Sequence, residues 1–190
     1  MKDADLTEHE TGSATVFRGK LLHVKRDTVR LPDGKAATRE YVEHGGAVMI
    51  IPVLDSGKLV MERQYRYVMR RDCIEFPAGK IDPGEEPLAT ARRELLEETG
   101  YVAREWSYLT TIHPTVAYST ERILVYLARG LELRGAKLDE GEFLEVLELA
   151  PAALLELVRA GEISDVKTVM GALWLEKLQR GEWAAGPALP

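Results

Sequence analysis

The sequence has few of the features that mark secreted, membrane-bound or nucleic-acid-binding proteins. Its one cysteine, Cys73, allows no internal disulfide, which fits a reducing cytoplasm. No window approaches the roughly 20 apolar residues of a membrane span, and the stretch MKDADLTEHE lacks the apolar core of a signal peptide. The net charge of -6 argues against a nucleic-acid surface, which is usually basic. We therefore expect a cytoplasmic protein with no nucleic-acid or membrane partner.

The N-terminal part of the chain predicts a small antiparallel sheet. After a loose tail to about residue 12, residues 14–17, 20–30 and 37–43 have the character of strands, and Pro-Asp-Gly-Lys at 32–35 is a strong turn signal. So small a sheet cannot bury a core of its own. It must therefore pack on the rest of the same subunit or on a second copy of the chain.

The rest of the chain, with 190 residues in total and 45% apolar residues overall, has the size and composition of one domain. The nearly continuous apolar run at 47–53 predicts a strand that is covered on both faces. Further elements are expected as follows: strands at 58–64, 106–112 and 122–128, helices at 152–159 and 165–179, and a tail at 184–190.

The most informative stretch is residues 76–101, FPAGKIDPGEEPLATARRELLEETGY. Its second half predicts a helix. Pro87 suits the first helical turn, where its missing N–H removes no internal bond, and Gly100 suits the position just past the end. Between them, apolar residues recur at spacings of three and four, which makes one apolar stripe.

Three carboxylates share one side of this short helix. At about 100° per residue, Glu94 and Glu98 lie about 40° apart, and Glu97 lies beside them. Like charges four residues apart repel, and the helix dipole disfavours anions in the last turn. A hard divalent cation such as magnesium would reverse both penalties. The alternative is a solvated acidic face with Arg92 and Arg93 as ion-pair partners.

The spacing of this stretch resembles the Nudix signature, Gly-x5-Glu-x7-Arg-Glu-U-x-Glu-Glu-x-Gly-U, in which U is a bulky aliphatic residue. The fixed positions fall on Gly79, Glu85, Arg93, Glu94, Leu95, Glu97, Glu98 and Gly100. Tyr101 takes the last aliphatic place, which is a packing position. The resemblance implies an α/β/α sandwich with a mixed sheet. We expect an N-terminal β-sheet over residues 1–44, with a role in dimerisation, and a Nudix hydrolase domain over residues 45–190.

The same resemblance implies a metal-dependent hydrolase of a nucleoside diphosphate linked to another group. Magnesium, or manganese, would be held by Glu94, Glu98 and the carbonyl before the signature glycine, here Ala78, with Glu97 as a further ligand. Arg93 faces Glu97 at i+4 and is expected to hold that carboxylate in place rather than to bind substrate. Arg93 and Glu97 are thus expected to support catalysis.

Two further segments resemble ADP-ribose pyrophosphatases of the Nudix superfamily. Residues 63–66 read Arg-Gln-Tyr-Arg, and the last arginine of that motif lies near the substrate diphosphate, which implies this role for Arg66. The alternative is a surface ion pair. Glu75 matches a family glutamate that helps to hold substrate. The acidic segment 139–146 resembles "DEDEFVEV" and implies Glu142 as the general base, with Glu140 as the second candidate.

One loop departs from the family pattern. Where these enzymes read like "SPGFSDE", residues 113–121 read HPTVAYSTE. Tyr118 fits the aromatic position of that pattern and Glu121 its acid, and both are expected to bind substrate. His113 is assigned to a structural role in preference to substrate contact. ADP-ribose, giving AMP and ribose 5-phosphate, is the best single substrate, and nucleoside diphosphate sugars or dinucleotides are the alternatives.

The resemblance also implies an intertwined homodimer formed through the N-terminal sheet. A non-catalytic sensor of ADP-ribose-like ligands is the alternative from a different class of protein. It is disfavoured because every acid of the signature is present.

Overall fold

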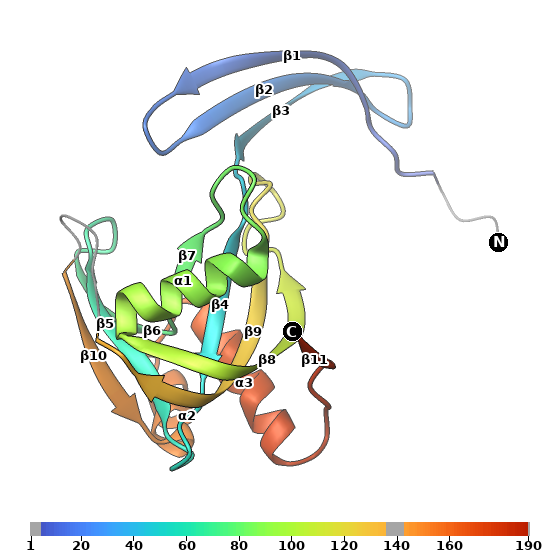
Figure 1. Cartoon of the computed structure of the whole chain (residues 1–190). Coiled ribbons are helices and arrows are strands. Elements are labelled where there is room, and N and C mark those ends of the chain that lie inside the picture. Colours follow the sequence, from blue (N-terminus) through green and yellow to red (C-terminus); the bar gives the residue numbers. More distant parts are fainter. Residues whose placement is uncertain (1–4, 136–142, 190) are drawn as a thin grey trace.

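The computed structural model describes residues 5–135 and 143–189 (Figure 1). The elements are β1 His9–Arg18, β2 His23–Arg30, β3 Ala36–Glu43, β4 Ala47–Pro52, β5 Leu59–Arg66, β6 Arg71–Glu75, β7 Ala78–Lys80, α1 Pro87–Thr99, β8 Tyr101–Ile112, β9 Ile123–Leu133, β10 Leu144–Leu149, α2 Pro151–Arg159, α3 Val166–Gln179 and β11 Ala188–Leu189. Within the described residues, no helix is long and apolar enough to cross a membrane.

The N-terminal strands form the predicted antiparallel sheet, in the order β1-β2-β3. Figure 1 shows this sheet projecting away from the remainder of the molecule. The predicted turn is present, because Gly34 has a positive φ of 86° and its N–H donates to the carbonyl of Leu31 at 2.9 Å. The expectation of a loose tail to residue 12 is wrong, since β1 begins at His9. Pairing with Arg30 of β2 extends the strand where local sequence gives no strand signal.

The central layer is a five-stranded mixed sheet in the order β11-β8-β9-β4-β7. β4 runs parallel to β9 and antiparallel to β7. All six residues of β4 are buried, as its apolar run predicted. A second sheet, in the order β10-β5-β6, is wholly antiparallel.

Helices cover both faces of the central sheet, so that the predicted α/β/α fold is confirmed. Figure 1 shows α1 on the near face and α2 and α3 on the far face. β4 supplies both interfaces because successive side chains of a strand point to opposite sides. Val48 and Ile50 pack in one cluster with Leu95 of α1, and Met49 lies in the other cluster with Ala172 of α3.

Two boundaries differ from the sequence-based expectation. β8 begins at Tyr101, directly after the helix, and β9 continues to Leu133, because the two strands pair along almost their whole length. The predicted C-terminal tail includes β11, which pairs with Trp106 and Ser107 of β8. This contact between the end of the chain and the central sheet has no local sequence signal.

Candidate active site

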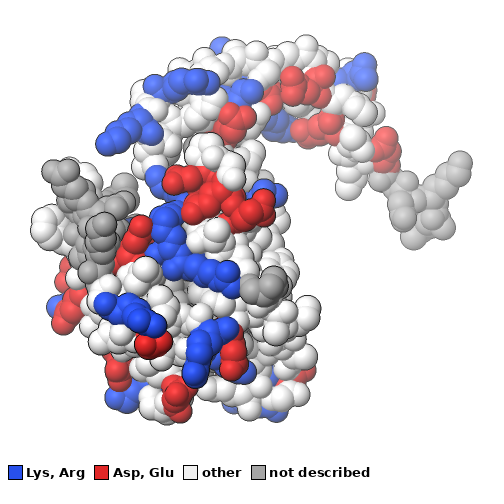
Figure 2. All heavy atoms as spheres, viewed as in Figure 1, with Lys and Arg blue, Asp and Glu red and all other residues white. Residues whose placement is uncertain are grey.

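A cavity of about 550 Å³ lies where β4, β5, β7 and α1 meet. Its lining is mostly polar and comprises His44, Ala47, Val48, Gln64, Arg66, Ala78, Gly79, Lys80, Asp82, Arg93, Glu94, Glu97, Glu98, Glu121, Ile123 and Lys167. Viewed as in Figure 1, acidic side chains gather near the start of α1, beneath the N-terminal sheet, and basic side chains lie beside them (Figure 2). Among the residues that line the cavity, acidic side chains such as Glu94 and Glu98 lie together with basic ones such as Arg66.

The helix that carries the carboxylates begins and ends as predicted. Pro87 occupies the first turn of α1, and Gly100 adopts the left-handed conformation with a φ of 76°. The N–H of Gly100 donates to the carbonyl of Leu96 at 2.9 Å and so closes the helix. Because the helix ends there, Glu97 and Glu98 lie in its final turn and face the cavity together with Glu94.

Arg93 links the acids of the helix to the preceding loop. Its Nη1 donates to Glu94 and to Glu97, each at 2.9 Å. Its Nε and Nη2 donate to the two carboxylate oxygens of Glu85, each at 3.0 Å. These hydrogen bonds lower the pKa of Glu85 to about 2 and raise that of Arg93. The contact between Arg93 and Glu97 is the one expected from their i+4 spacing.

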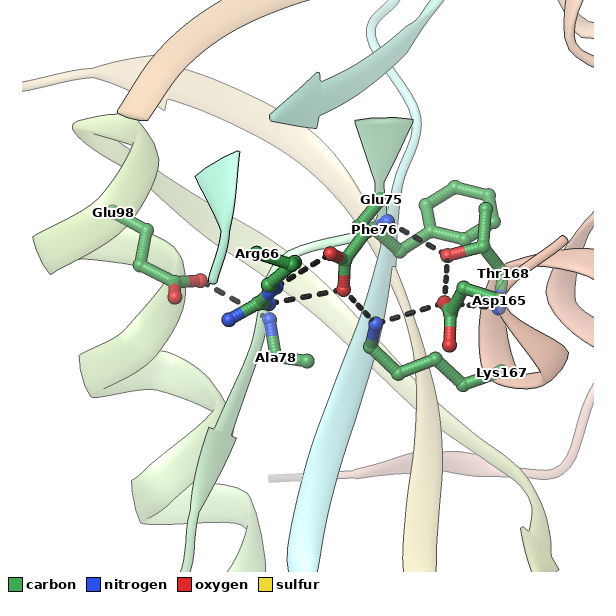
Figure 3. A network of polar contacts seen from close by, with 8 residues as sticks. All are labelled: Arg66, Glu75, Phe76, Ala78, Glu98, Asp165, Lys167 and Thr168. Carbon is green, nitrogen blue, oxygen red and sulfur yellow. Dashed lines mark hydrogen bonds and ion pairs between the residues drawn. The ribbon is translucent and has the colours of Figure 1, made fainter. Parts of the chain in front are cut away.

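Strand β7 approaches the same helix very closely. The backbone N–H of Ala78 donates to Glu98 Oε2 at 3.1 Å, as Figure 3 shows. A Cβ atom on Gly79 would lie 1.9 Å from Cδ of Glu94, so only glycine leaves room for that carboxylate. The signature glycine thus permits strand β7 and the acids of α1 to share one wall of the cavity.

A second group of ion pairs lies at the other side of the cavity (Figure 3). Arg66 donates to Glu75 through Nε at 2.6 Å and through Nη2 at 2.9 Å. Lys167, from α3, contacts the same carboxylate and also Asp165, the latter at 2.8 Å. Burial raises the pKa of Glu75, but its bonds to Arg66 and Lys167 outweigh burial and leave the pKa below its ordinary value.

Comparison with known proteins identifies the family. Residues 43–169 match the NUDIX domain, and residues 8–42 match the nucleoside diphosphate sugar hydrolase N-terminal domain. This chain belongs to the Nudix family. The first match includes the signature helix and every residue that lines the cavity.

This Nudix protein is similar to several characterised bacterial proteins. It is 40% identical over 173 residues to the ADP-ribose pyrophosphatase of Bacillus subtilis (strain 168), covering 90% of this chain and 94% of the relative. It is 37% identical over 163 residues to the methanol dehydrogenase activator of Bacillus methanolicus, and the match covers 85% of this chain and 88% of the relative. The crystal structure of an ADP compounds hydrolase has the same fold, with a TM-score of 0.85 and 24% sequence identity. The match covers 95% of this chain and 98% of that one.

Nudix hydrolases generally depend on a divalent metal, and the donors of this chain fit one. Within residues 5–135 and 143–189, no three acidic, histidine or cysteine side chains are already arranged around one point. Arg93 instead draws Glu94 and Glu97 to itself, and Glu98 turns toward the Ala78 N–H. The donors are nonetheless carboxylates and a carbonyl on one wall, which is the chemistry that magnesium prefers.

Sequence reasoning missed two residues of this site. Lys167 was missed because a lysine in the last predicted helix carries no local signal of what it contacts. Glu62 of β5 is fully buried, and neither of its carboxylate oxygens has a hydrogen-bond partner among the described residues. Burial and the charge of Glu75 raise the pKa of Glu62 to about 8. The sequence could have indicated Glu62, because residues two apart in a strand share one face and Arg66, four residues later, was already a predicted site residue. Gln64 and Arg66 of the same strand do line the cavity.

The structure separates the predicted substrate residues. Arg66 and Glu121 line the main cavity, whereas Tyr118 lines a smaller one of about 270 Å³ next to β3. Two backbone bonds hold that loop to β3: the Val42 N–H donates to Tyr118 O at 2.9 Å, and the Thr120 N–H donates to Val42 O at 3.0 Å. His113 is exposed and lines neither cavity. Glu140 and Glu142 lie outside the described residues.

Proposed function

We propose that this protein hydrolyses the diphosphate bond of a nucleoside diphosphate linked to a second group, with ADP-ribose as the first substrate and AMP and ribose 5-phosphate as the products. One observation carries the proposal. A single cavity has the signature carboxylates on one wall and Arg66 on another. A diphosphate needs both, because its charge must be neutralised before water can attack phosphorus.

We assign the metal to Glu94, Glu98 and the Ala78 carbonyl, with Glu97 as a further ligand. Magnesium, or manganese, bound there supplies charge neutralisation and lowers the pKa of a bound water. Arg93 donates to Glu94 and to Glu97 and so holds the two carboxylates in place beside the cavity. Glu142 remains the predicted base that takes the proton of the attacking water, and Glu140 is the alternative.

The substrate is held by a different set of residues in this proposal. Arg66 binds the diphosphate, since a guanidinium presents its donors as a rigid fork that matches phosphate oxygens. Glu75 fixes the orientation of that fork, and Glu121 lies in the same cavity to meet the sugar hydroxyls. Tyr118 is assigned to the base or sugar end, because it lies on the loop beside the N-terminal sheet.

ADP-ribose is supported by the similarity to the Bacillus subtilis enzyme, and two observations keep nucleoside diphosphate sugars and dinucleotides as the second candidate. The loop at residues 113–121 departs from the usual pattern of ADP-ribose pyrophosphatases. The N-terminal residues match a domain named for nucleoside diphosphate sugar hydrolases. The single cysteine supports a reducing compartment, and we place the enzyme in the cytoplasm.

The test is a substrate panel with the purified protein and magnesium. ADP-ribose, ADP-glucose, UDP-glucose, NADH and diadenosine polyphosphates are each incubated, and the release of phosphatase-sensitive product is followed. A preference for ADP-ribose supports the proposal, and a preference for sugars or dinucleotides transfers it to the second candidate. No turnover on any of them, with folded protein that binds magnesium, would contradict hydrolysis and favour a ligand sensor.

We further propose that the protein is a homodimer formed through residues 1–44. Every residue of β1 is exposed, and the sheet presents Val16, Phe17, Leu21 and Leu22 to solvent. Large apolar side chains gathered on one projecting element are typical of a protein interface. Sedimentation should give about twice the chain mass of 21.2 kDa. Phe17→Glu should give the monomer, whereas a monomeric wild type would contradict the proposal.

A further inference from the structure

Lys167 is a cation in an unusual place. It lies one residue inside the N-terminus of α3, yet its side chain is only 12% exposed and lines the main cavity. Its ammonium group contacts Glu75 of β6 and Asp165 of its own helix start. Burial lowers the pKa of Lys167, but the charges of Asp165 and Glu75 raise it further, so that the side chain stays charged.

The position of Lys167 is fixed by the docking of α3. Asp165 caps the helix by accepting the Thr168 N–H at 3.1 Å and its hydroxyl at 2.7 Å. The Thr168 hydroxyl in turn accepts the Phe76 N–H at 3.3 Å. A Cβ atom on Gly171 would lie 2.9 Å from Phe76 Cε2, so α3 packs very closely at this point. The amine is therefore held beside Glu75 before any ligand arrives.

Glu75 connects this amine to the arginine of the cavity. Its carboxylate is 5% exposed and receives Arg66 through Nε and Nη2, while Oε2 also accepts from Lys167. Arg66 uses Nε and Nη2 for Glu75, and Nη1 takes part in neither of these bonds. In Figure 3 that nitrogen points away from Glu75, toward the side of Glu98 and Ala78. Nη1 is thus the nitrogen of Arg66 that is directed at the cavity.

We propose that Lys167 is a positioning residue for the substrate diphosphate: it holds Glu75, which holds Arg66 with one nitrogen directed at the cavity. The inference rests on the proposed function, because it presumes an anionic ligand at Arg66. Without Lys167, Glu75 loses one of its two cations and still faces the nearby carboxyl of Glu62. Its carboxylate then has no fixed position from which to orient the arginine.

The test measures ADP-ribose binding by calorimetry in metal-free protein, where substrate is not consumed. Lys167→Met keeps an unbranched side chain, shorter by one atom, and removes its charge. We expect the dissociation constant to rise roughly tenfold, since a hydrogen bond between charged groups is lost. The same loss should be almost absent in an Arg66→Gln background, because residues that act through one another are not additive. Lys177→Met is the matched control, because it removes a charge and an exposed ion pair with Glu182 near the other end of the same helix.

The outcomes separate the possible roles. Loss of affinity in Lys167→Met, retained affinity in Lys177→Met and non-additivity with Arg66→Gln support positioning. An equal loss in Lys177→Met would mean that any positive charge on α3 attracts the substrate, and full additivity would mean that Lys167 contacts the substrate directly. Either result overturns the proposal. If the wild-type protein does not bind ADP-ribose, ADP-ribose is not the substrate. The single and double variants are then measured with the compound that the substrate panel identifies. Magnesium affinity, measured in parallel, should not change in Lys167→Met.

Discussion

Two clusters of ion pairs line the same cavity, and they differ in their balance of charge. In the first, one cation contacts three carboxylates: Arg93 with Glu85, Glu94 and Glu97. In the second, two cations contact two carboxylates: Arg66 and Lys167 with Glu75 and Asp165. The first cluster therefore keeps an excess of negative charge, whereas the second is neutral.

The difference indicates what each side of the cavity attracts. Excess carboxylates repel one another, and only a cation from solution can remove that repulsion. The neutral cluster contains an arginine with one nitrogen directed at the cavity, which suits a phosphate oxygen. One wall is therefore suited to metal and the other to the anionic substrate. The following variants test this division, from the largest expected effect to the smallest.

Glu98→Gln should remove the metal-dependent activity. Glutamine keeps the size of the side chain and an acceptor for the Ala78 N–H, but it loses the negative charge. We expect turnover to fall by roughly a thousandfold or more, which corresponds to about 4 kcal/mol in the barrier. Steady-state kinetics with magnesium measure this, and Glu148→Gln, in an exposed ion pair with Lys58, is the control. A near-normal rate in Glu98→Gln would remove it from the metal site.

Arg93→Met should destabilise the protein, and magnesium should restore part of the loss. Without the guanidinium, three neighbouring carboxylates lose their charged donor, which costs about 1–3 kcal/mol in the free energy of unfolding. Urea unfolding with and without magnesium measures both effects. Arg159→Met breaks an exposed pair with Glu156 and should change stability by less than about 0.5 kcal/mol. Equal losses in the two variants would argue against a special role for the acidic cluster.

Gly79→Ala should weaken metal binding more than it weakens folding. The new Cβ would overlap the end of the Glu94 side chain, which can swing aside at little cost to stability. The displaced carboxylate would no longer serve the same site, and we expect the magnesium dissociation constant to rise about tenfold, or about 1.4 kcal/mol. Calorimetry measures it. Gly12→Ala, with open space around the added Cβ, is the control, and an unchanged constant in Gly79→Ala would count against the assignment of Glu94.

Glu85→Gln should have the smallest effect, and the effect should depend on pH. The folded pKa of about 2 lies below the ordinary 4.5, so Glu85 stabilises the native state above pH 4.5 and loses that contribution as pH falls toward 2. At about pH 6, the variant should be less stable by on the order of 1 kcal/mol or less, because the pair is partly solvated. Urea unfolding at several pH values measures the difference. If the difference in the free energy of unfolding between wild type and Glu85→Gln grew as pH fell, the low pKa assigned to Glu85 would be wrong.

The Nudix signature was predictable because its information is local. A helix of 13 residues fixes which of its side chains share a face, so spacing alone placed Glu94, Glu97 and Glu98 on one side of the helix, and the structure shows that this side lines the cavity. The fold class followed from the resemblance to the Nudix signature that the same spacing carries. The start of β1 and the pairing of β11 did not follow, since they depend on partners far along the chain.

The sequence by itself determined the helix, its cap at Gly100 and the set of acids that the helix presents to a metal. Only the tertiary structure decided what those acids face. Lys167 and Glu75 are 92 residues apart, and their contact exists because the start of α3 docks on the end of β6. The burial of Glu62, whose carboxylate has no hydrogen-bond partner among the described residues, is likewise a product of tertiary packing. Contacts between distant segments arise from the packing of whole elements, and no local pattern of residues encodes them.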